Sequence, residues 1–147
     1  MSVNFRFIET TPERVFEVLA NGWLYPSWVV GASRMRDVDD AWPHEGARLF
    51  HSFGVWPFLI NDSTSVLEWD PPRHMKIKAR GWPIGEAHVT LDVKPRKNGC
   101  VVRIHEDAVR GPGLYIPAPI RQSMLHARNT ETLQRLAFLA EGGATAN

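Results

Sequence analysis

The sequence predicts an α+β domain in which an antiparallel sheet wraps around one long C-terminal helix. A row of short strand-like segments lies between Gly46 and Pro112, most of them interrupted by Gly, Pro or Asn, and one long amphipathic pattern follows it. The sheet must cover its apolar face with that helix, because no other element of comparable size remains. We therefore expect a cavity between the sheet and the helix.

The size and composition of the chain limit its class. With 147 residues, 44% of them hydrophobic, residues 1–147 are expected to form one domain with a sizeable core. Seventeen basic and sixteen acidic residues are interleaved, which argues against nucleic-acid partners. The single cysteine, Cys100, excludes an internal disulfide and a cysteine-based zinc cluster. The N-terminus shows no signal-peptide pattern, and no stretch approaches the roughly 18 consecutive apolar residues that a membrane span needs. We therefore expect a cytoplasmic protein without membrane insertion. We also expect it to be a monomer or a weak dimer.

The N-terminal third begins with a strand and continues with helical signals. Residues Val3–Glu9 alternate Val3, Phe5 and Phe7 with Asn4, Arg6 and Ile8, which indicates a strand with one buried face. Thr11 as N-cap and Pro12 at the first helical position then predict a helix that ends near Asn21 and Gly22. The aromatic segment Trp23–Gly31, interrupted by Pro26, is interpreted as a short second helix or turn that plugs one end of the fold.

The pattern in the middle of the chain predicts a meander of strands. The expected strands are Arg34–Val38, Ala47–Phe53, Leu59–Trp69, His74–Arg80, Glu86–Lys94 and a last one that starts at Cys100. In the strand from His74, Met75, Ile77 and Ala79 alternate with cationic residues, which is typical of an antiparallel strand with one solvated face. The tripeptide Lys97-Asn98-Gly99 predicts a hairpin turn.

The last element is a long helix from Ile116 to about Glu141, ended by Gly142 and Gly143. Its apolar stripe is expected to contain Ile120, Met124 or Leu125, Leu133, Leu136, and Leu139 or Ala140.

The order of these elements resembles the helix-grip fold of the START and Bet v 1-like (SRPBCC) superfamily, including its polyketide cyclase/dehydrase group. The segments that carry the resemblance are 11–16, 66–73 and 133–136, and the match covers nearly the whole chain. The resemblance implies a seven-stranded antiparallel sheet gripping the last helix, two short helices after the first strand, and an apolar cavity. It implies no single chemistry, because this fold serves lipid carriers, hormone receptors, cyclases, oxygenase subunits and chaperone cofactors.

Strand parity points to two candidate catalytic residues. Glu106 shares the inward parity of Val102 and Ile104, and His51 shares that of its neighbours Leu49 and Phe53. A neutral histidine and a glutamate in an apolar pocket form an acid/base pair suited to aldol-type cyclisation or dehydration. In the alternative interpretation, Glu106 pairs with Arg103 or Arg128 and His51 only fills the core.

Other residues are candidates for ligand contact. Asn129 lies on the buried stripe of the last helix, where it could bind a ligand or tether a strand carbonyl, and Arg128 is either a rim residue or the counter-ion of Glu106. Trp56 and Tyr115 either line the cavity mouth or cap the core. The full expected set is Trp28, Phe53, Trp56, Phe58, Leu67, Trp69, Ile77, Leu91, Ile104, Tyr115, Met124, Leu125, Arg128 and Asn129.

The sequence is compatible with three functions. The first is binding of a small apolar molecule that is lipid-like, aromatic or polyketide-like. The second is a cofactor-independent cyclase or dehydratase that uses His51 and Glu106 as acid and base, with Asn129 orienting a carbonyl. The third is a protein-interaction module, which requires an exposed apolar patch. The histidines show no metal-site spacing and there is no Gly-rich phosphate loop, so we expect neither a metal nor a cofactor.

Overall fold

The computed structural model describes residues 2–30, 32–53, 60–81, 85–110 and 115–142. Its strands form a seven-stranded sheet in the order β1-β7-β6-β5-β4-β3-β2, in which every neighbouring pair is antiparallel. The strands are β1 (Ser2–Ile8), β2 (Ala32–Val38), β3 (Arg48–Phe53), β4 (Ile60–Asp70), β5 (His74–Gly81), β6 (Gly85–Arg96) and β7 (Gly99–Arg110). The predicted helix-grip arrangement is confirmed.

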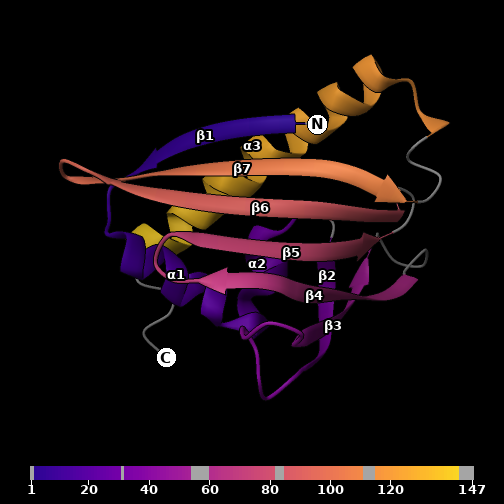
Figure 1. Ribbon diagram of the computed structural model, residues 1–147, viewed down its shortest axis with the longest axis horizontal. Coiled ribbons are helices and arrows are strands. Elements are labelled where there is room, and N and C mark those ends of the chain that lie inside the picture. Colours follow the sequence, from indigo (N-terminus) through magenta and orange to yellow (C-terminus); the bar gives the residue numbers. More distant parts are fainter. Residues whose placement is uncertain (1, 31, 54–59, 82–84, 111–114, 143–147) are drawn as a thin grey trace.

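The helices gather on one face of the sheet, and the long helix crosses it (Figure 1). They are α1 (Pro12–Ala20), the 3-10 turn η1 (Gly22–Leu24), α2 (Tyr25–Trp28) and α3 (Ala118–Gly142). The predicted short helices after the first strand are present. The hydroxyl of Thr11 accepts a hydrogen bond from the Arg14 N–H, so Thr11 is the N-cap of α1 and fixes where that helix begins.

The buried stripe of α3 differs in part from the predicted one. Leu125, Leu133 and Leu136 are buried as expected. Of the two alternative pairs, Leu125 and Ala140 are the buried members, and Met124 is 49% exposed. Ile120 is 55% exposed, so the first turn of the helix does not bury the apolar residue predicted there. Within the described residues, no helix combines the length and the apolar character needed to cross a bilayer.

The face of β1 that points into the core is the more polar one. Asn4 and Ile8 are buried, whereas Phe5 and Phe7 are exposed. The register explains this orientation, because Asn4 pairs with Ile104 and Ile8 with Cys100, both buried residues of β7. The Asn4 amide donates hydrogen bonds to the His126 carbonyl at 3.2 Å and to the Thr130 hydroxyl at 2.9 Å, which ties β1 to α3.

The hairpin between β6 and β7 has the predicted turn. Asn98 adopts a left-handed φ of 65°, a conformation that asparagine tolerates better than most residues. A side chain at Gly99 would bring a Cβ atom within 2.3 Å of the Ile8 carbonyl oxygen, so only glycine fits between β7 and β1 at this point.

An irregularity in β4 reverses the side-chain alternation predicted for that strand. Val66 pairs with Ile77 and Glu68 pairs with Lys76, so Leu67 is an extra residue in a bulge. Beyond the bulge, Trp69 pairs with the buried Met75 and packs against the core.

Candidate ligand-binding site

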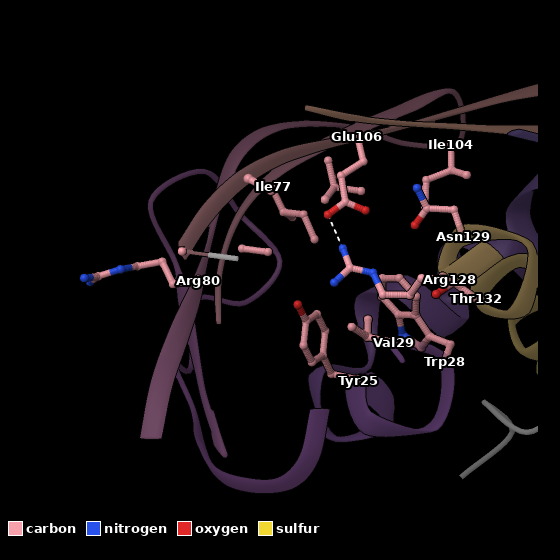
Figure 2. A pocket seen from close by; sticks show the side chains of 14 residues that line it. Tyr25, Trp28, Val29, Ile77, Arg80, Ile104, Glu106, Arg128, Asn129 and Thr132 are labelled. Carbon is pink, nitrogen blue, oxygen red and sulfur yellow. Dashed lines mark hydrogen bonds and ion pairs between the residues drawn. The ribbon is translucent and has the colours of Figure 1, made fainter. Parts of the chain in front are cut away.

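A cavity of about 50 Å³ lies between the inner face of the sheet, α2 and α3. Its walls are mainly apolar, and its polar side chains come from α2, β5, β7 and α3 (Figure 2). The described residues that line it are Tyr25, Trp28, Val29, Ile77, Ala79, Arg80, Gly85, Ala87, Val89, Ile104, Glu106, Arg128, Asn129 and Thr132.

A carboxylate reaches the cavity from the sheet and is paired with a cation from the helix. Glu106 lies opposite Val89 of β6 and is 1% exposed. The Arg128 guanidinium donates a hydrogen bond to its carboxylate, drawn as the dashed line in Figure 2. A buried carboxylate requires such a partner, because an unpaired charge in a low-dielectric site is costly. Of the two arginines that the alternative interpretation named as partners of Glu106, the structure therefore pairs it with Arg128.

The amide of Asn129 is a buried polar group in the cavity wall. Asn129 is 2% exposed, and its Nδ2 atom has no hydrogen-bond partner within the described residues. A buried amide donor without an acceptor costs about 1–3 kcal/mol. A ligand oxygen at this position would remove that cost.

A relay of hydrogen bonds connects the cavity to His51. The hydroxyl of Tyr25 lies 2.9 Å from the Thr64 hydroxyl, which in turn lies 2.9 Å from His51 Nε2. The Tyr25 ring stacks on the imidazole at a centroid distance of 5.3 Å, and Tyr25 rather than His51 lines the cavity. In Figure 2 the hydroxyl end of the Tyr25 ring lies on the side of the cavity where Glu106 and Arg128 meet.

Burial sets the protonation of both ends of this relay. Burial raises the pKa of Tyr25 to about 12, so its hydroxyl keeps its proton at neutral pH and can donate it in a hydrogen bond. Burial lowers the pKa of His51 to about 4, so its imidazole is neutral there. The neutral hydroxyl of Tyr25 thus lines the same cavity as the ion pair, and the neutral His51 lies behind it, linked through Thr64.

The structure brings only part of the predicted set to the cavity. Trp28, Ile77, Ile104, Arg128 and Asn129 line it together with Glu106. The other described members lie elsewhere: Leu67 is in the bulge, Trp69 packs on Phe16, Leu91 and Leu125 are in the core, and Met124 and Tyr115 are 49% and 90% exposed. Trp56, Phe58 and the side chain of Phe53 are outside what the structure describes.

Sequence reasoning missed several cavity residues. Ala79, Ala87 and Val89 carry the inward parity of β5 and β6, so the alternating pattern could have included them. Thr132 follows Asn129 by three residues on the same helix face. Tyr25 had no periodic signal, because it belongs to a single turn of helix. No group of three or more His, Cys, Asp or Glu side chains in the described part of the chain is arranged to hold a metal ion.

Solved structures with the same fold are numerous, and their sequences are distant. A protein from Nitrosomonas europaea superposes with a TM-score of 0.72 at 16% identity, over 97% of this chain and 95% of that one. The di-domain ARO/CYC StfQ from the steffimycin biosynthetic pathway gives 0.72 at 12% identity, over 97% of this chain and 50% of that one. The Aha1 dimer from Colwellia psychrerythraea gives 0.63 at 13% identity, over 95% of each chain.

The comparison with protein families is more specific. No curated protein matches the chain. The model of the family described as polyketide cyclase / dehydrase and lipid transport matches residues 3–141, from β1 to the end of α3. The chain therefore belongs to the polyketide cyclase/dehydrase and lipid-transport family of the START and Bet v 1-like superfamily.

Proposed function

We propose that this protein binds a small, largely apolar molecule in the cavity between the sheet and α3, with the Asn129 amide as its polar anchor. Family membership supports a hydrophobic-ligand-binding or cyclase role. The observation that carries the finer proposal is the Nδ2 atom of Asn129, which is buried in a mainly apolar cavity wall without a hydrogen-bond partner among the described residues. Ligand sites commonly combine apolar walls with a few polar groups that fix orientation.

The size of the cavity limits what enters it. A cavity of about 150 Å³ accepts benzene, whereas this one measures about 50 Å³. A ring-sized ligand therefore requires a wall to move. Arg80 and Arg128 are the wall residues with long, partly exposed side chains, 51% and 23% exposed, so their movement is the first candidate for such an opening.

A pair of probes that differ in one polar atom tests the anchor. Acetophenone and ethylbenzene have similar shapes, but only acetophenone carries a carbonyl oxygen. We expect acetophenone to bind more tightly by about 0.5–1.5 kcal/mol, the net value of one hydrogen bond. The measurement is NMR titration of the full chain, with the indole N–H signal of Trp28 reporting occupancy.

Two substitutions on α3 separate the contribution of the Asn129 amide from the effect of placing a leucine elsewhere on the helix. Asn129→Leu should abolish the preference for acetophenone and leave ethylbenzene binding intact. Gln134→Leu, at an exposed position of the same helix, should preserve the preference. A preference that survives in Asn129→Leu would contradict the assignment of the anchor.

A second pair of variants tests whether the probes bind in this cavity. Ala87→Leu places a larger side chain in the cavity wall and should abolish binding of both probes. Ala127→Leu, on the exposed side of α3, should leave binding unchanged. If neither probe perturbs Trp28 in the unsubstituted protein, the cavity does not take ring-sized ligands and the proposal fails. Native mass spectrometry of protein purified from its own host would then identify any stoichiometric adduct of another kind.

One observation favours a second candidate function, a cofactor-independent cyclase or dehydratase. The hydroxyl of Tyr25 faces the Glu106 carboxylate across the cavity, so a proton donor and a proton acceptor flank the same space. In this mechanism Glu106 removes a proton beside a ligand carbonyl, Tyr25 protonates the leaving or developing oxygen, and His51 positions Tyr25 through Thr64. Glu106→Gln and Tyr25→Phe should then abolish turnover of a linear poly-β-ketone while leaving its binding largely intact. Turnover that persists in Glu106→Gln would exclude this role.

A further inference from the structure

The outer face of the sheet carries a groove that is separate from the cavity. It encloses about 690 Å³ and spans the N-terminal half of β1, the start of β5 with the preceding Arg73, the C-terminal part of β6 and the facing part of β7. The helices lie on the opposite face of the sheet (Figure 1), so no described helix covers this groove. Its apolar lining includes Phe5, Pro95 and Val101.

The floor of the groove exposes an aromatic ring. Phe5 is 65% exposed, because the register of β1 turns Asn4 and Ile8 toward the core and Phe5 away from it. Phe7, on the same face of β1, is 44% exposed. Apolar surface left open and bordered by charged residues is typical of interaction sites.

The rim of the groove is positively charged. Lys94 and Arg96 project from β6 and Arg103 from β7, and none of the three forms an ion pair with another described residue. The Nε atom of Arg103 is buried without a hydrogen-bond partner in the described structure. The carboxylate in the lining, Asp92, is already hydrogen-bonded to His74 at 2.7 Å.

We propose that this groove is a second binding site and that it takes an acidic segment of a partner protein with an apolar side chain beside its carboxylates. The apolar side chain would cover Phe5 and Val101, and the carboxylates would pair with Lys94, Arg96 and Arg103. The guanidinium and ammonium groups, which form no ion pair with another described residue, supply the complementary charge. Arg103 lines the groove and has a buried Nε donor without a hydrogen-bond partner in the described structure.

Charge and shape favour a peptide over other anionic partners. A nucleic acid requires cations that follow several successive phosphates, but the cationic rim is adjoined by carboxylates at Asp70, Glu68 and Asp92. An anionic membrane surface would meet the same carboxylates. A short peptide can place its acidic side chains on the three cations and avoid these carboxylates.

Selection from a library of displayed random peptides on the immobilised full-length protein tests the proposal. The sequences retained should be enriched in Asp and Glu next to Leu, Ile or Phe. The double variant Lys94→Glu/Arg96→Glu should not retain them. The matched control is Lys76→Glu/Lys78→Glu, which makes the same change in charge on the outer face of β5, outside the groove. Selection of basic or uncharged sequences, or of none, would overturn the proposal.

Fluorescence anisotropy with the best selected peptide gives the quantitative test. We expect Lys94→Glu/Arg96→Glu to weaken binding by about tenfold or more, and Lys76→Glu/Lys78→Glu to change it by less than about twofold. Phe5→Ser should also weaken binding. Equal losses in both double variants would show general electrostatic attraction and contradict a groove. Tighter binding of a single-stranded oligonucleotide or of vesicles containing phosphatidylserine than of the peptide would assign the surface to a different partner.

Discussion

Acidification should destabilise this protein through one buried imidazole. His51 is fully buried, and its pKa falls from the ordinary value of 6.5 to about 4, mainly because burial disfavours the charged ring. Between those two values the unfolded chain binds a proton at this residue and the folded chain does not, so the free energy of unfolding decreases as the pH falls. At about 1.4 kcal/mol for each pKa unit, a fall from 6.5 to about 4 corresponds to a total loss of about 3.5 kcal/mol, of which about 3 kcal/mol has been lost by pH 4.

Urea unfolding followed by tryptophan fluorescence, repeated from pH 8 to pH 4, measures this loss. The carboxylates of the protein also titrate in this range, so the comparison is with His51→Gln, which has no charge to gain and an amide that can still bond Thr64. The difference between the two proteins should be flat above about pH 7 and change by about 3 kcal/mol below it. Parallel curves down to pH 4 would refute the reasoning. If His51→Gln does not fold, direct NMR titration of the His51 ring replaces it, and a measured pKa near 6.5 would be the contrary result.

Three further predictions concern the sheet and its contact with α3. His74→Gln should lower the free energy of unfolding by about 1 kcal/mol or less at pH 5, and by less than that at pH 9. Burial alone would lower the pKa of His74, but hydrogen bonds to Asp92 and Glu68 outweigh burial and raise it. The stabilisation from protonated His74 is therefore complete below the unfolded pKa and is lost as the pH rises through the folded pKa. The check is urea unfolding at both pH values. Leu136→Ala should lower the free energy of unfolding by about 2–5 kcal/mol, because Leu136 is fully buried in the core. Asn4→Ala should lower the free energy of unfolding by about 1–2 kcal/mol, because it removes the two hydrogen bonds that join β1 to α3. It should also increase amide hydrogen exchange in the middle of α3, and unchanged exchange would contradict this prediction.

The alternating strands of the sheet could be predicted because periodicity reports directly on one buried face. The positions of Ile77, Val89 and Ile104 follow from a period of two, and the same parity placed Glu106 on the inner face. Parity fails where a bulge adds a residue, as at Leu67, because every later side chain then changes face. Such a bulge depends on the neighbouring strand and leaves no mark in the local sequence.

Which inward-facing side chains reach the cavity could not be predicted in the same way. His51 has the inward parity expected of it, but the Tyr25 ring lies between its imidazole and the cavity. Periodicity tells which face a residue occupies and says nothing of which side chain covers another. The sequence also leaves the ion-pair partner of Glu106 undetermined between Arg103 and Arg128, because the choice depends on how α3 packs against β7.

The register of β1 shows why a short polar side chain occupies a buried position in preference to an aromatic one. The Asn4 amide lies 3.2 Å from the carbonyl of His126, so the backbone of α3 is within hydrogen-bond reach of β1 and leaves no space for a ring. A shift of one residue would place Phe5 against α3 and turn Asn4 outward, which would remove the tie to the helix and produce a steric clash. The same shift would take Phe5 out of the outer groove. The close approach of α3 to β1 therefore determines both the packing beside the cavity and the aromatic floor of the groove on the opposite face.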